Sequence, residues 1–78
     1  MVVLKLINTG EDKNGNHSSY TYAIGKHPKT KLVVQRNPQG YWYIYKLTGK
    51  NARMLTEQGF KTASTATNEC IRLAELMF

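Results

Sequence analysis

The pattern of hydrophobic and polar positions is clearest between Lys31 and Leu47. Two runs rich in β-branched and aromatic residues flank the segment 37–40, Asn-Pro-Gln-Gly. Such runs on either side of a turn-forming segment predict a β-hairpin. An Asx side chain first, a proline with its φ already set, and a glycine last suit a type I turn. Gly40 then takes the left-handed conformation and closes the hairpin with a bulge.

This bulged turn predicts which residues lie opposite one another. It pairs Asn37 with Tyr41, and the pairs that follow are Arg36/Trp42, Gln35/Tyr43, Val34/Ile44, Val33/Tyr45 and Leu32/Lys46. One face then carries an apolar floor for a helix: Leu32, Val34, Trp42 and Ile44. The other face carries Lys31, Val33, Gln35, Tyr41, Tyr43 and Tyr45. A loop without the bulge would exchange partners between the faces, and we favour the bulged register because it separates apolar from amphipathic side chains.

Weaker patterns predict further strands. Residues 2–7 form a β-type run and residues 20–24 alternate as Tyr-Thr-Tyr-Ala-Ile, so we expect a strand and its return strand. The polar segment 8–19 between them is expected to be a mobile hairpin loop. Residues 25–30 are typical of a basic turn, in which Pro28 blocks the ladder. A Thr-Gly-Lys-Asn turn at 48–51 leads to a strand at 52–56, and Phe60 is expected to insert into the core.

Residues 62–78 carry the helical pattern. Thr62 is the expected N-cap, and apolar residues recur at helical spacing opposite a polar side on which Glu69 and Arg72 can pair. The fold class is therefore α+β: a small antiparallel sheet of four to five strands packed against one C-terminal α-helix. We expect residues 1–78 to form a single domain, with N-terminal strands in 1–24, a central basic antiparallel sheet at 31–56 and the helix at 62–78.

The distribution of charge indicates which kind of partner the protein binds. Eleven Lys and Arg residues against five Asp and Glu give a net charge of +6. Between Lys26 and Lys61 there are eight basic residues and one acidic residue, Glu57, whereas the rest of the chain is close to neutral. A positive central sheet favours a polyanion or an acidic protein surface as partner; the alternative is a charge excess that only aids solubility.

The chain offers little for catalysis. Its five carboxylates lie in the polar loop, at a turn and on the exposed helix side, where no pair is held together for acid–base work. Cys70 falls on the apolar side of the helix and is expected to be a core residue. His17 and His27 lack the spacing of a zinc site. We expect no enzyme activity, no cofactor and no metal.

Location follows from similar arguments. A single cysteine excludes an intrachain disulfide and fits a reducing compartment. The amino terminus lacks the layout of a signal peptide, and no apolar run approaches the ~18 residues of a membrane span. We expect a cytoplasmic protein of a bacterial or phage-infected cell, with no membrane partner and with an oligomeric state that the sequence leaves open.

The tyrosines carry the binding hypothesis. Tyr41, Tyr43 and Tyr45 alternate along one strand and therefore share a face. That face either packs under the helix or stays open, in which case rings and hydroxyls lie beside basic groups that suit phosphates and base edges. The candidate nucleic-acid-binding residues are Lys31, Gln35, Arg36, Tyr41, Tyr43, Tyr45, Lys46, Lys50 and Arg53.

Residues 36–76 carry a resemblance to a known family. The pattern is a Gly-Tyr-Trp-Tyr strand at 40–43, a Thr-Gly-Lys turn at 48–50, a Gly-Phe-Lys-Thr helix entry at 59–62, and an Ala-rich amphipathic helix. It resembles the arm-type DNA-binding domain at the amino terminus of phage and transposon tyrosine integrases. The resemblance implies that three strands backed by a helix insert the open sheet face into the DNA major groove. The family domain lacks the two strands predicted in residues 2–24, and we expect a stand-alone module without a catalytic domain, not a recombinase.

Two functions follow. The first is a small non-enzymatic nucleic-acid-binding module, with DNA favoured over RNA, that uses the basic tyrosine-rich face. The second is a small phage or mobile-element protein that binds and modulates or inhibits an acidic host protein through the same face, because Tyr and Arg also suit protein interfaces.

Overall fold

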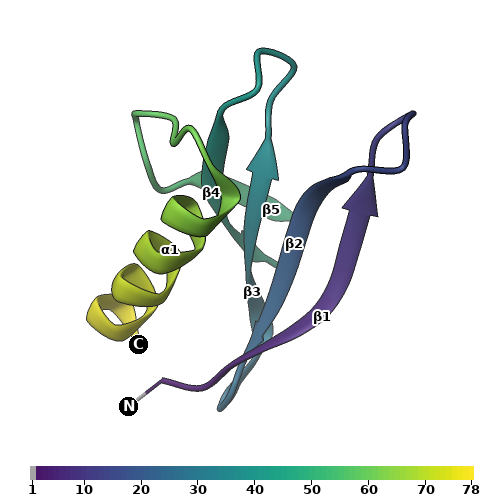
Figure 1. Ribbon diagram of the computed structural model, residues 1–78. Coiled ribbons are helices and arrows are strands. Elements are labelled where there is room, and N and C mark those ends of the chain that lie inside the picture. The colour runs from purple at the N-terminus through teal and green to yellow at the C-terminus, as the bar shows by residue number, and fades with distance from the viewer. Residues whose placement is uncertain (1) are drawn as a thin grey trace.

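The computed structural model describes residues 2–78 and shows an antiparallel sheet with one helix on one side (Figure 1). The elements are β1 (Leu4–Glu11), β2 (His17–Ile24), β3 (His27–Arg36), β4 (Trp42–Thr48), β5 (Asn51–Met54) and α1 (Ala63–Met77). The five strands lie in the sheet in their chain order, each antiparallel to the next. The predicted α+β class and C-terminal helix are therefore confirmed.

The central hairpin has the predicted bulged register. Every predicted pair from Arg36/Trp42 to Leu32/Lys46 is present between β3 and β4. In the turn, the Asn37 N–H donates to the Tyr41 carbonyl at 2.7 Å and the Gly40 N–H donates to the Asn37 carbonyl at 3.0 Å. The Asn37 side chain accepts from the Tyr41 N–H at 2.9 Å, and Gly40 has a φ of +94°. Local turn chemistry thus sets which side chains meet the helix.

The core lies between this hairpin and α1. Leu32, Val34 and Ile44 are fully buried and Trp42 is 7% exposed. The helix presents small residues to them, with Ala66, Cys70 and Ala74 all fully buried. Small side chains let the helix axis approach the sheet closely, so α1 packs across β3 and β4. The tyrosine face is therefore the face away from α1.

The prediction that residues 8–19 form a mobile loop is wrong. β1 continues to Glu11 and β2 begins at His17, which leaves only residues 12–16 in the turn. The Asp12 carboxylate organises this turn by accepting from the N–H groups of Asn14 at 2.9 Å and Asn16 at 3.0 Å. Polar side chains do not stop the strands, because the ladder is made by the backbone and this part of the sheet is not covered by α1.

Two other boundaries differ from expectation. Pro28 lies inside β3, not in a separate turn: Ala23 pairs with Lys31 but Ile24 pairs with His27, so a bulge absorbs the residues between them. A bulge tolerates proline because its residues do not all donate to the ladder. β5 ends at Met54, before the expected residue 56. The chain then stays beside β4, and Phe60 forms a bridge with Trp42 and packs against the core.

The ends of the helix follow the sequence. The Thr62 hydroxyl accepts from the Thr65 N–H at 3.2 Å, which confirms the predicted N-cap. Glu69 and Arg72 form the predicted ion pair on the exposed side. No helix in residues 2–78 is long and apolar enough to cross a membrane.

Candidate nucleic-acid interface

The uncovered face of the sheet carries the predicted tyrosines. Lys31, Gln35, Tyr43 and Tyr45 project from it, since each lies one residue from a position buried under α1. Val33, at its centre, is 8% exposed although α1 lies on the other face, because neighbouring side chains pack around it. Tyr43 and Tyr45 are half-buried and Tyr41 is 43% exposed. The aromatic strip is thus partly open to solvent, and most open at Tyr41.

Tyr43 also has a packing role. A Cβ atom built on Gly59 would lie 3.0 Å from the Cζ of Tyr43 and 2.6 Å from the Cβ of Tyr41. Glycine at this position lets the segment after β5 pass directly beside the two tyrosines. Tyr43 therefore packs against the chain at Gly59, with its hydroxyl on that side, whereas Tyr45 has no such neighbour at Gly59.

Small polar residues continue the same face onto β1 and β2. Ser19 lies opposite Gln35, and Thr21 lies opposite Val33. Asn8 and Gly10 then lie opposite Thr21 and Ser19 on β1. The face therefore has an aromatic half and a low, hydroxyl-bearing half, with few large side chains to obstruct an extended ligand.

The net charge collects at one end of the sheet, which we call the basic pole. It comprises the end that holds the β2–β3 and β4–β5 turns, and its basic residues are Lys5, Lys26, Lys29, Lys31, Lys46, Lys50 and Arg53. The acidic residue at this end is Glu75, in the last turn of α1. At the opposite end, three basic residues (Lys13, Arg36, Lys61) match three acidic ones (Glu11, Asp12, Glu57). Because Arg72 is paired with Glu69, the basic pole accounts for the whole net charge of +6.

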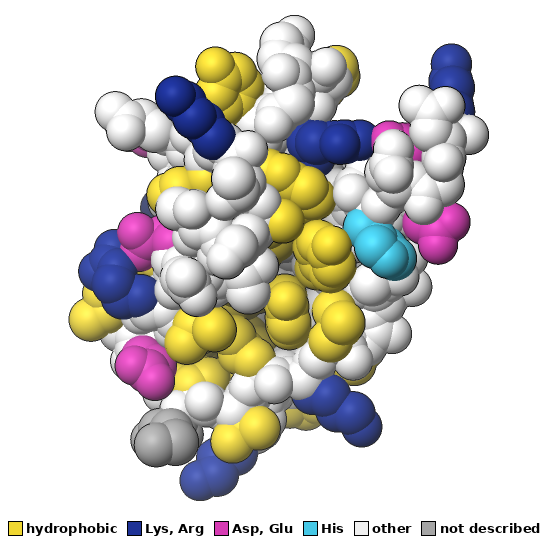
Figure 2. Space-filling model, in the orientation of Figure 1, with side chains coloured by type: hydrophobic (Ala, Val, Ile, Leu, Met, Phe, Trp, Pro, Cys, Tyr) yellow, Lys and Arg dark blue, Asp and Glu magenta, His cyan; other side chains and the backbone are white. Residues whose placement is uncertain are grey.

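Figure 2 shows part of this separation from the helix side, with basic side chains at the lower end and basic and acidic ones together at the upper right. A potential concentrated at one end attracts and orients a polyanion more strongly than the same charge spread evenly. The collection of charge at the basic pole could not be read from positions in the sequence, because Lys5 reaches the pole from β1 whereas Arg36 and Lys61 lie at the opposite end.

Three candidate residues lie on the helix side of the sheet. Arg36 shares the face of Trp42, with its guanidinium 2.6 Å from Asp12 and 6.0 Å from the centroid of the Trp42 ring. The structure thus separates Arg36 from the tyrosine face on which we had placed the binding surface. Lys46 and its partner Arg53 also point to the helix side, but at the basic pole; the Lys46 Nζ lies 5.5 Å from the Phe78 ring centroid. Lys50 lies in the β4–β5 turn between the two faces.

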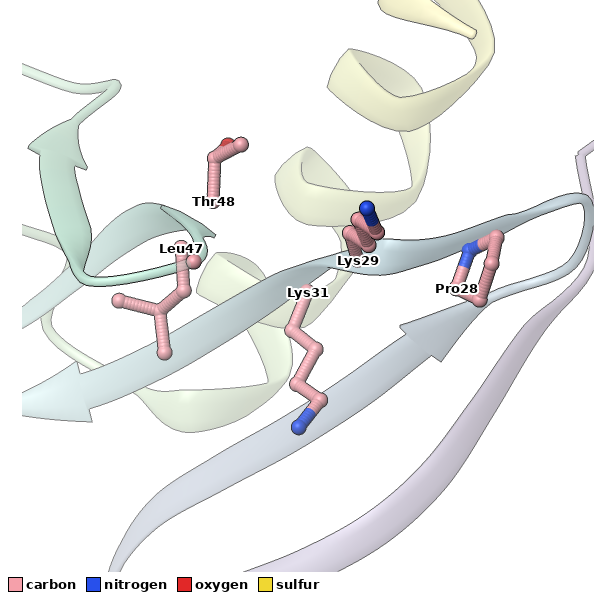
Figure 3. Close-up of a pocket in the computed structure, with 6 residues that line it drawn as sticks. Pro28, Lys29, Lys31, Leu47 and Thr48 are labelled. Atoms are coloured by element: carbon pink, nitrogen blue, oxygen red, sulfur yellow. The ribbon is translucent and has the colours of Figure 1, made fainter.

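The pole also contains a shallow hollow of about 370 Å³. Its lining residues are Pro28, Lys29, Lys31, Leu47, Thr48 and Gly49. Figure 3 shows Lys31 and Leu47 pointing to one side of the sheet, and Lys29 pointing to the other. An apolar floor between lysines on both faces suits a sugar-phosphate backbone that passes around the end of the sheet, because lysine stems contact the sugar and ammonium groups contact phosphate.

The Asp12–Arg36 pair, at the neutral end, allows the electrostatic contribution of a carboxylate to the stability of the fold to be tested. The N–H of Asn16 is the largest influence that lowers the pKa of Asp12 below its ordinary value of 3.8; the Asn14 N–H and Arg36 act in the same direction, and desolvation opposes them. A carboxyl group whose pKa is lowered by folding stabilises the fold above its unfolded pKa, and that contribution disappears as the pH falls through the folded pKa.

We therefore expect Asp12→Asn to lower the urea midpoint at about pH 7 and to have a smaller effect at about pH 2, because the contribution of the carboxylate is lost progressively as the pH falls. The measurement is urea unfolding of both proteins at both pH values. Glu57→Gln, which removes a carboxylate at the same end, is the control and should shift the midpoint little at either pH. An Asp12→Asn effect that is equal at both pH values would contradict the electrostatic origin.

Cysteine and the metal-ligating residue types are the remaining candidates for chemistry. Burial raises the pKa of the Cys70 thiol to about 11, and this side chain is fully enclosed by the core. No group of three His, Cys, Asp or Glu residues within 2–78 is placed to hold a metal ion. Comparisons with family models, curated proteins and solved structures find no match for this chain, so the resemblance to arm-type domains stays a prediction.

Proposed function

We propose that this protein is a non-enzymatic nucleic-acid-binding module that holds double-stranded DNA against its tyrosine face and basic pole. The observation that carries the proposal is the coincidence of two features. The whole net charge lies at one end of the sheet, and that end adjoins a sheet face that no helix within residues 2–78 covers. A charge excess that served only solubility would not need to be segregated in this way.

Each part of the surface has a role in the proposal. Lysines of the pole neutralise phosphates, which supplies affinity without sequence preference. Gln35 and the hydroxyls of Tyr43 and Tyr45 reach base edges, because an amide and a hydroxyl both donate and accept hydrogen bonds. Three central strands at ~4.8 Å spacing are about 10 Å wide, which is compatible with a major groove about 12 Å wide.

Duplex DNA is favoured over single strands by the burial of the rings. Stacking on an unpaired base requires an exposed aromatic face. Tyr43 and Tyr45 are half-buried, and Tyr43 is packed beside Gly59. Of the three tyrosines on this face, Tyr41 is the one exposed enough to stack on a base. Such a module would act in the cytoplasm of a bacterial or phage-infected cell.

The test is fluorescence anisotropy of labelled duplex DNA, single-stranded DNA and RNA, each at about 50 mM and about 200 mM salt. We expect the tightest binding to duplex DNA, weakened steeply by salt because each neutralised phosphate releases a counterion. Preference for single strands or RNA would overturn the groove mode. Absence of binding to all three at low salt would overturn the proposal and leave an acidic protein as the partner to seek.

A further inference from the structure

One edge of the sheet is long, unpaired and apolar. β1 forms this edge over eight residues, from Leu4 to Glu11, and its outer side has no neighbouring strand in the described chain. Val3, Leu6 and Ile7, at or just before this strand, are 65%, 47% and 45% exposed. The other edge strand, β5, has only four residues. Proteins usually shorten, charge or cover an exposed edge, because its free N–H and C=O groups pair readily with another strand.

An apolar strip beside this edge is also only partly covered. Leu6 pairs with Tyr22, which pairs with Leu32, so these side chains share the helix side of the sheet with Tyr20 and Leu4. α1 packs mainly across β3 and β4, so Leu4, Tyr20 and Tyr22 lie at the margin of the core and are only partly buried. Figure 2 shows hydrophobic side chains exposed in a band between the helix and this edge. A monomer leaves this strip in contact with water.

The charges indicate which partner fits the edge. The Leu4–Lys5 end of β1 belongs to the basic pole, and the Glu11 end adjoins Asp12 at the neutral end. An antiparallel neighbour of the same sequence places its acidic residues beside the basic pole and its own pole beside Glu11. We propose that β1 pairs antiparallel with β1 of a second copy and joins the two sheets into one.

A two-fold axis perpendicular to the sheet relates the copies in this arrangement, as in any isologous antiparallel edge pair. Both tyrosine faces then lie on one side, and the two basic poles lie at opposite ends of the joint sheet. On the other side, the apolar strips meet along the new seam. The bulge between Leu6 and Asn8 divides the strand, and with the axis at Ile7 residues 4–6 of one copy lie against residues 8–10 of the other.

The first test places a charge at the centre of the seam. Analytical ultracentrifugation over a concentration series measures the wild type, Ile7→Lys and Ile71→Lys. Ile7 and Ile71 are the same residue type and both are 45% exposed, but Ile71 lies on α1. We expect the wild type to approach twice the 8.9 kDa of one chain and Ile7→Lys to weaken the dimer at least about tenfold, because two lysines face each other across the axis.

The second test addresses the antiparallel orientation. Glu11→Lys puts a positive charge against the partner's basic pole and should weaken the dimer several-fold, whereas Glu57→Lys makes the same charge change away from the edge and should not. Circular dichroism confirms that each variant is folded. A wild-type monomer at the highest concentration, or equal effects of each variant and its control, would overturn the proposal. DNA binding by a monomer would leave the proposed function standing.

Discussion

Replacing Lys31, Lys50 and Arg53 together with alanine is expected to weaken duplex-DNA binding by on the order of 100-fold at ~0.1 M salt. The three residues belong to the basic pole, and all three are exposed, so their removal does not open the core. Removing one phosphate-binding side chain reduces the slope of log affinity against log salt by about 1, so the slope should fall by about 3. Anisotropy titrations of the variant and the wild type across a salt series measure both quantities.

The control is a second triple variant with the same change in net charge at other places. Its substitutions are Lys13→Ala, Lys61→Ala and Arg72→Ala, all exposed. We expect its affinity to fall only a few-fold, because these residues lie away from the pole and Arg72 is already paired with Glu69. Equal decreases in the two triple variants would mean that only net charge matters. An unchanged affinity for duplex DNA in the triple variant of the basic pole would contradict the proposed interface.

The sequence was most informative where structure depends on a few adjacent residues. The Asn-Pro-Gln-Gly turn closes through bonds of Asn37 to Gly40 and Tyr41, and the β3–β4 pairs continue from that closure in the predicted register. Because strand side chains alternate, the register then decided that the tyrosines lie away from α1. The N-cap at Thr62 was predictable for the same reason: a hydroxyl three residues before a free N–H is a local feature.

Features that depend on neighbours distant in the chain were not predictable. Residues 8–11 and 17–19 look like a loop because they lack apolar side chains, yet β1 and β2 pair through the backbone as far as Glu11 and His17. Pro28 was expected to break the strand, but it lies in a bulge of β3 whose position is set by the pairing with β2. The segment between Lys26 and Lys61 carried the charge excess in the sequence, but folding moves Arg36 to the neutral end, where Asp12 pairs with it.

The largest decrease in stability is expected from Ile44→Ala. Ile44 is fully buried on β4, in the core cluster that packs against α1, and its truncation leaves a cavity that the sheet cannot close by moving one side chain. Such changes cost about 2–5 kcal/mol in the free energy of unfolding. A chain of 78 residues has only about 4–12 kcal/mol in total, so this one substitution removes a large part of it.

Ile71→Ala is the matched control, since it removes the same atoms from a side chain that is 45% exposed on α1. We expect it to cost less than about 1 kcal/mol. Urea unfolding followed by the fluorescence of Trp42 suits both variants, because this residue is the single tryptophan of the chain and lies in the same core. If Ile44→Ala and Ile71→Ala lowered the free energy of unfolding by similarly small amounts, Ile44 would not be enclosed, and the helix would not cover the face of β3 and β4 that carries it. The tyrosine face would then no longer be the open one, because the two faces of one sheet exchange roles together.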